Sequence, residues 1–274
     1  MCYGAKDFVT NKMFTTNLFS AERPDFEINH RQIANVTKLP FTISDLKPVN
    51  RKTLVVLVVS LCCLMANNFF TNASHLPIVN KWIGGDNYIF NHYMYWALSS
   101  IAIYVVLPVI TIHFYFKENV AEYGWKIQNF FGYYKIYLLS LLVILPLVFL
   151  ASFDSSFQQT YPFYVPPMDG AFQKYFVWEF FYVLQFFALE FFFRGFMVHG
   201  LKKELGVLSV FVMTIPYCMI HFVKPLPECI GSVFASVFLG LMSYKTQSVW
   251  MGSLAHTIVA LAMNWLGLWH RGYF

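Results

Sequence analysis

Long apolar runs, separated by short polar stretches, dominate the pattern of hydrophobic and polar positions along this chain. Several runs can cross about 30 Å of hydrocarbon at about 1.5 Å of helical rise per residue. They lack the alternating segments of about ten residues that form membrane β-barrels. The pattern therefore predicts an all-α, polytopic membrane bundle of seven transmembrane helices, with eight as the alternative. The predicted spans are residues 53–71, 92–116, 134–153, 175–200, 205–222, 228–245 and 248–268.

Composition and charge agree with this fold class. Hydrophobic residues make up 58% of the 274 residues and charged residues only 12%. With the predicted spans, fourteen Lys and Arg residues fall on the side that holds the N-terminus and four on the opposite side. Because positive residues concentrate in cytoplasmic loops, the N-terminus is expected to be cytoplasmic. This topology explains the net charge of +5, so nucleic acid is not expected as a partner.

The polar N-terminal segment is distinct from the rest of the chain. It lacks the apolar core of a cleaved signal peptide, so we predict a cytoplasmic arm over 1–52 and a transmembrane domain over 53–274. The five cysteines show no spacing typical of a zinc site or of a disulfide framework. They are expected to be mostly buried thiols.

Four ionisable residues interrupt the apolar runs of the C-terminal third: Glu190, Arg194, His221 and His256. Such residues at membrane depth are rare and usually functional. Glu190 and Arg194 are four residues apart on one helix face, which permits an ion pair, although a buried pair costs desolvation. Each residue also has a structural explanation, as polar contacts between helices, an interfacial histidine or a core histidine bonded to a carbonyl. Together they favour chemistry inside the membrane.

These residues resemble the motifs of the intramembrane CAAX prenyl endopeptidases and bacteriocin-processing proteases, the CPBP or Abi family. The family carries paired glutamates with an arginine four positions after the second, then Phe-x-x-x-His, then His-x-x-x-Asn, on separate membrane helices. The resemblance covers about residues 175–268.

Three positions depart from the family motifs. Leu189 stands where the family has its first glutamate, and Tyr217 stands where it has phenylalanine. Ala260 stands where it has asparagine, although Asn264 follows one turn later on the same face. The complete set of family catalytic residues is therefore not present.

The resemblance implies an intramembrane endopeptidase that hydrolyses a peptide bond. Glu190 and His221 would activate water, and His256, with Asn264 as support, would donate hydrogen bonds to the oxyanion. Arg194 would keep Glu190 ionised and oriented, while Glu228 would add a carboxylate near His221.

The expected partners are membrane lipid and a peptide or lipidated peptide substrate, in a bacterial cytoplasmic membrane. We predict no cofactor and leave the question of a metal open, because a zinc site would need Glu228 to join the two histidines and Glu190. A catalytically inactive scaffold or bacteriocin-immunity protein is the main alternative. A small transporter is the weaker one, since the ionisable residues are confined to one third of the chain.

Depth within the spans raises a geometric difficulty. Glu190 and His256 lie about 12 to 15 Å from the cytoplasmic ends of their spans, but His221 lies about 24 Å from the start of its own. For the three to meet, the fifth helix must begin outside the hydrocarbon, tilt, or break near Pro216. A further carboxylate, Glu179, is expected to meet water near the outer interface.

Overall fold

The computed structural model describes residues 50–127, 132–167 and 172–274. The predicted arm lies outside these residues except for its last three. Within the described ranges the secondary structure is helical apart from one isolated bridge, between Trp125 and Ser248. The predicted all-α, polytopic fold is therefore confirmed.

Six helical segments are long and apolar enough to cross a membrane. They are α2 (Arg51–Phe70); α4 (Tyr88–Ile110) with its π-helical extension η3 (Thr111–Phe116); α5 (Tyr134–Ala151); the continuous segment formed by α7 (Gln173–Glu190), η5 (Phe191–Met197) and α8 (Val198–Leu205); α10 (Leu226–Thr246); and α11 (Trp250–His270). The shorter elements are η2 (Ala73–His75), α3 (Pro77–Trp82), η4 (Val120–Tyr123), α6 (Ser155–Thr160) and α9 (Leu208–Met219).

The fifth predicted span is shorter than the sequence pattern indicated. In its place, α9 has twelve residues, which give about 18 Å of helix and are too few to cross the hydrocarbon. The helix ends three residues after Pro216, and Lys224-Pro225 then leads into α10. Proline lacks a backbone donor and disfavours helical conformation in the residue before it, which explains the early end. His221 consequently lies in the turn after α9.

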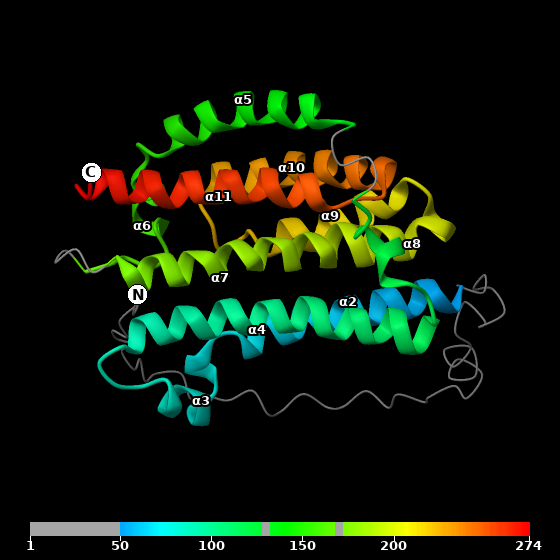
Figure 1. The fold of residues 1–274 in the computed structure, drawn as a ribbon, viewed down its shortest axis with the longest axis horizontal. Coiled ribbons are helices and arrows are strands. Elements are labelled where there is room, and N and C mark those ends of the chain that lie inside the picture. Colours follow the sequence, from blue (N-terminus) through cyan, green and yellow to red (C-terminus); the bar gives the residue numbers. More distant parts are fainter. Residues whose placement is uncertain (1–49, 128–131, 168–171) are drawn as a thin grey trace, which may run out of the picture. The chain divides into compact units, whose positions relative to one another are not determined.

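Neighbouring helices are arranged so that α7 lies between α4 and α11. Figure 1 shows α7 and α11 side by side and running in opposite directions, with α5 at the edge beside α11. We call the end at which α2 begins and η3 ends the inner end, after the predicted orientation, and the opposite end the outer end. At the inner end the Lys52 ammonium lies 2.7 Å from the Glu118 carboxylate.

Small residues allow close helix packing between α9 and α10. A Cβ atom on Gly240 would lie only 2.6 Å from Cγ1 of Val210, so the Val210 side chain occupies the space that a larger residue would need. One turn earlier the Ser236 hydroxyl donates to Thr214 Oγ1 at 3.1 Å. Close contact through small and hydroxylated residues is the usual way in which membrane helices associate. These contacts hold α9 against α10.

The connection after η3 contacts both η5 and the start of α11 through Tyr123, Gly124 and Trp125. Gly124 has a positive φ of 91°, and its carbonyl accepts the Val249 amide at 2.9 Å. The Trp250 indole donates to the Trp125 carbonyl at 3.2 Å. A Cβ atom on Gly195 would lie 2.5 Å from the Tyr123 carbonyl oxygen, so only glycine fits at this point of η5. These contacts hold the inner parts of α7 and α11 in register.

Candidate active site

Glu190 is the last residue of α7 and is fully buried. The chain continues into the π-helical segment η5, a local widening that is often found at functional sites. Arg194 lies within η5, is also fully buried, and places Nη1 3.0 Å from Glu190 Oε1. The ion pair expected from the four-residue spacing is therefore formed.

His256 joins this pair from α11. Its Nδ1 lies 2.8 Å from Glu190 Oε1, the same oxygen that Arg194 approaches. Because a carboxylate only accepts hydrogen bonds, Nδ1 must carry a proton, which leaves Nε2 pointing away from the carboxylate. Phe186 packs on the other side of the imidazole with a ring separation of 4.6 Å. The structure thus brings Glu190, Arg194 and His256 together.

The second oxygen of Glu190 has a different environment. Among the described residues Oε2 has no hydrogen-bond partner. It faces Gly252, one turn before His256, where an added Cβ atom would lie 3.5 Å from this oxygen. Oε2 is itself buried, and the glycine leaves it without a side-chain neighbour at that position. This oxygen is the part of the cluster that is free to accept a proton.

His221 lies beside this cluster but is held by a different contact. Its Nδ1 lies 2.8 Å from the Tyr217 carbonyl, so this nitrogen donates and Nε2 is left as an acceptor. The Tyr217 ring lies 4.8 Å from the His221 ring and 6.3 Å from the His256 ring. The two histidines therefore lie against one tyrosine. Within the described residues no hydrogen bond joins His221 directly to Glu190 or His256.

Glu228 belongs to a separate polar group at the outer end. Both of its oxygens lie 2.8 Å from the Tyr161 hydroxyl, and Lys224 Nζ lies 3.8 Å from Oε1. Lys224 also donates to the Tyr161 hydroxyl at 3.2 Å and lies 3.8 Å above the Phe163 ring. Burial lowers the pKa of Lys224 to about 8, although the Glu228 charge opposes this shift. The structure does not place the Glu228 carboxylate in contact with His221.

Asn264 also lies away from the Glu190 cluster. It is fully buried two turns beyond His256, which is about 12 Å along α11. Its side chain lies beside the Glu179 carboxylate, which accepts the Tyr175 hydroxyl at 2.8 Å. Neither amide atom of Asn264 completes a hydrogen bond within the described residues. The support that the resemblance implied for His256 therefore needs another source.

Glu179 differs from its expected setting, because it is 7% exposed rather than in contact with water. The sequence did contain a signal for this. Glu179 precedes Glu190 by three helical turns on a similar face, so both point toward α11. The role of Tyr217, in contrast, had no signal in the sequence, because its contacts with Arg194 and the histidines join separate helices.

The donor set for zinc is not assembled. In the part of the chain that the structure describes, no three His, Cys, Asp or Glu side chains converge as metal ligands do. Glu228, on which the zinc hypothesis depended, is bound to Tyr161 and Lys224 instead. These residues do not fit a tetrahedral metal site, and we derive no step through a metal.

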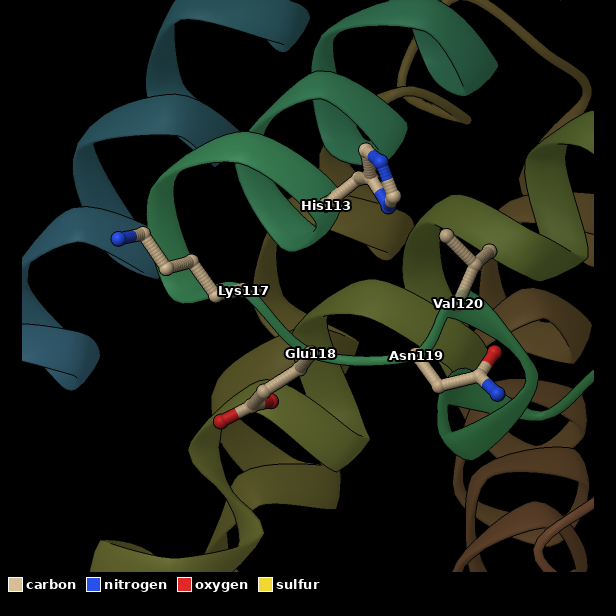
Figure 2. Close-up of a pocket in the computed structure, with 5 residues that line it drawn as sticks. All are labelled: His113, Lys117, Glu118, Asn119 and Val120. Atoms are coloured by element: carbon tan, nitrogen blue, oxygen red, sulfur yellow. The ribbon is translucent and has the colours of Figure 1, made fainter.

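A pocket of about 490 Å³ opens at the inner end, away from these residues. Figure 2 shows its lining, His113, Lys117, Glu118, Asn119 and Val120, with the Glu118 carboxylate turned away from His113. That carboxylate is already bound by Lys52 and by the Tyr123 hydroxyl, at 2.7 and 2.6 Å. The carboxylate of this pocket is therefore already paired, and the pocket lies apart from the Glu190 cluster.

Fold and site define a polytopic membrane protein in which a buried carboxylate and guanidinium meet a partly buried imidazole between the helices. Residues 171–262, about a third of the chain, match the protein-family model of type II CAAX prenyl endopeptidase Rce1-like proteins. This match confirms the resemblance over the segment that carries the motifs, and indicates a CAAX-protease type of function. It includes Glu190, Arg194, His221 and His256 and ends before Asn264. No curated protein and no solved structure matches the chain.

Proposed function

We propose that this protein is an intramembrane endopeptidase of the CAAX-protease and bacteriocin-processing type. The observation that carries the proposal is the buried Glu190 carboxylate, one oxygen of which meets Arg194 and His256 while the other is free. Removing a carboxylate, a guanidinium and an imidazole from water costs free energy of folding. Their presence side by side therefore favours a functional role. Their position inside the Rce1-like segment supports hydrolysis as that role.

In the proposed reaction, Glu190 Oε2 accepts a proton from a water molecule, which attacks the carbonyl carbon of the scissile peptide bond. His221 supports this step because its Nε2 can accept the second hydrogen bond of the water. The C–N bond then breaks, and the proton moves from Glu190 to the leaving nitrogen. The overall change is the addition of one water across the peptide bond.

His256 and Arg194 take the remaining roles. The proposed step requires a proton on both ring nitrogens of His256, so that Nδ1 stays on Glu190 while Nε2–H donates to the oxyanion. As Glu190 takes up a proton, negative charge moves to the oxyanion, and the Arg194 and His256 charges then stabilise it. The cluster therefore stabilises the transition state more than the ground state, which is the condition for catalysis.

Cleavage by the full-length protein in proteoliposomes tests this function. A panel of prenylated peptides and leader peptides is incubated with wild type, Glu190→Gln, His221→Ala and His256→Ala at equal folded amounts. His270→Ala is the matched control, because His270 lies on the same helix as His256 but bonds Ser152 at the outer end, at 2.9 Å. We expect wild type and His270→Ala to cleave and the other three to lose activity.

A catalytically inactive scaffold is the second candidate function. Leu189, in the position of the first family glutamate, is packed in the main apolar core and cannot act as an acid or base. This function predicts no cleavage of any peptide by wild type, together with a cellular phenotype that Glu190→Gln still supports. Cleavage that survives in Glu190→Gln would also contradict the proposed mechanism.

A further inference from the structure

The Tyr217 side chain contacts more of the candidate site than any one catalytic residue does. It is 2% exposed and lies in α9, one residue after Pro216. Its ring faces the Arg194 guanidinium, and the rings of both histidines lie beside it. The family motif has phenylalanine at this position. The aromatic ring is therefore shared by the motif and this chain, whereas the hydroxyl is present only in this chain.

The Arg194 guanidinium needs a second partner besides Glu190. None of its three nitrogens makes a hydrogen bond of good geometry within the described residues, although Nη1 lies 3.0 Å from the carboxylate. The guanidinium carbon lies 3.8 Å from the centre of the Tyr217 ring, so the cation stacks on the face of the ring. Cation–π attraction is strongest where water is excluded, and Arg194 is fully buried. The face of the ring therefore stabilises the buried charge of Arg194.

The same residue fixes His221 through its backbone. Because the Tyr217 carbonyl accepts from Nδ1 of His221, Nε2 of that ring is set as an acceptor. The early end of α9 after Pro216 permits this contact, since the histidine lies in the turn beyond the helix. This contact belongs to the backbone of residue 217, so it does not depend on the ring.

We propose that Tyr217 is a positioning residue, whose ring holds Arg194 on Glu190 while its carbonyl presets His221. The inference rests on the proposed function for its effect on rate. It assigns the effect to the aromatic ring and not to the hydroxyl. The competing explanation is that Tyr217 is an ordinary core aromatic, because it also packs 5.2 Å from the Phe193 ring.

Three variants in the cleavage assay separate these explanations. Tyr217→Phe keeps the ring, Tyr217→Leu removes it, and Phe196→Leu removes a buried ring of the same core that stacks on Tyr123 and Phe192. We expect Tyr217→Phe to keep kcat within about twofold, and Tyr217→Leu to lower kcat by roughly ten- to hundredfold with little change in KM. Phe196→Leu should lower the folded amount without changing kcat per folded molecule.

Equal losses in Tyr217→Leu and Phe196→Leu would overturn the proposal in favour of packing alone. A loss in Tyr217→Phe as large as that in Tyr217→Leu would overturn it in favour of the hydroxyl. Both outcomes differ from failure of the proposed function, in which wild type itself cleaves nothing.

A stability measurement tests the ring–cation contact even if wild type cleaves nothing. The midpoint of thermal unfolding is measured for Tyr217→Leu in wild type and in an Arg194→Met background. We expect a larger decrease with Arg194 present, because only then does the buried cation lose its ring. Phe196→Leu should lower the midpoint equally in both backgrounds. Equal effects of Tyr217→Leu in both backgrounds would contradict the proposal.

Discussion

Two carboxylates on one helix, Glu190 and Glu179, face α11 from inside the bundle and have opposite surroundings. Glu190 meets a guanidinium and an imidazole and keeps one oxygen free. Glu179 meets the Tyr175 hydroxyl and lies beside Asn264 and Trp265, and no ion pair to it occurs in the described residues. Burial of an acidic residue in a membrane protein is therefore a weaker sign of function than the partners that compensate its charge.

The difference predicts which region carries chemistry. At Glu190 one partner, Arg194, is charged, and its removal leaves an unbalanced charge in the protein interior. At Glu179 the partners are neutral, so substitutions there should act through packing and hydrogen bonds. Substitutions in the two regions should consequently differ in the type of effect, on activity or on stability, as well as in its size.

The largest effect is expected from Arg194→Met. Loss of the guanidinium leaves Glu190 buried without its main counter-charge, which should lower the free energy of unfolding by about 3–5 kcal/mol and abolish cleavage. Denaturant or thermal unfolding in detergent checks the stability, and the peptide assay checks the activity. The control is Glu179→Gln, which should cost about 1 kcal/mol. A stable, active Arg194→Met variant would contradict the assigned difference.

Gly252→Ala tests the role of Glu190 Oε2, the carboxylate oxygen without a hydrogen-bond partner. The new Cβ atom would lie 3.5 Å from Glu190 Oε2, an ordinary contact, so the variant should fold like wild type. It should nevertheless reduce cleavage by roughly ten- to hundredfold, because it occupies space where water would approach this oxygen. Gly231→Ala, at a position with open space, is the matched control. Unchanged kcat in Gly252→Ala would place the water elsewhere.

Asn264→Ala tests whether Asn264 supports the oxyanion, as the family pattern implies, or only packs beside Glu179, as the structure indicates. A donor to the oxyanion is worth about 10²- to 10³-fold in rate, and the resemblance alone would assign that role to Asn264. Its position beside Glu179 instead predicts cleavage within about twofold of wild type and a change in unfolding free energy of about 1 kcal/mol or less. Initial rates at saturating peptide give the answer. A hundredfold decrease in the initial rate would show that Asn264 acts in the active site.

The smallest effect is expected for Lys224, in the polar group that contains Glu228 at the outer end. The pKa of Lys224 is about 8 in the folded protein and 10.5 in its usual setting, so between these values the unfolded chain binds more protons. Stability should therefore rise with pH from about 8 to 10.5 relative to Lys224→Met, in which this contribution is absent. Thermal unfolding across that pH range measures the difference. Parallel curves for the two proteins would contradict the burial of Lys224.

Local periodicity explains what could be predicted from the sequence. The six long spans follow from apolar runs, and the contact of Glu190 with Arg194 follows from their spacing on one helix. The short α9 could be anticipated in part from Pro216 and from Lys224-Pro225, which disfavour helix continuation.

Contacts between distant segments could not be predicted in the same way. The attachment of Glu228 to Tyr161 joins residues 67 positions apart, and the outer connection that carries Tyr161 has no periodic signal. The stacking of Arg194 on Tyr217 likewise depends on how α9 packs against η5. Asn264 lies on the predicted face of α11, yet two turns from His256 bring it to a different partner.

The most direct test of the central claim compares Glu190→Gln with Glu179→Gln in one cleavage assay, at equal folded amounts in the same proteoliposomes. Both changes replace a buried carboxylate of α7 by its neutral isostere, so packing and helix are matched. We predict that Glu190→Gln lowers the initial rate by about 10²- to 10⁴-fold, the usual worth of a general base, while Glu179→Gln retains most of it. Equal losses, or a greater loss in Glu179→Gln, would contradict the assignment of the active site to the Glu190 cluster.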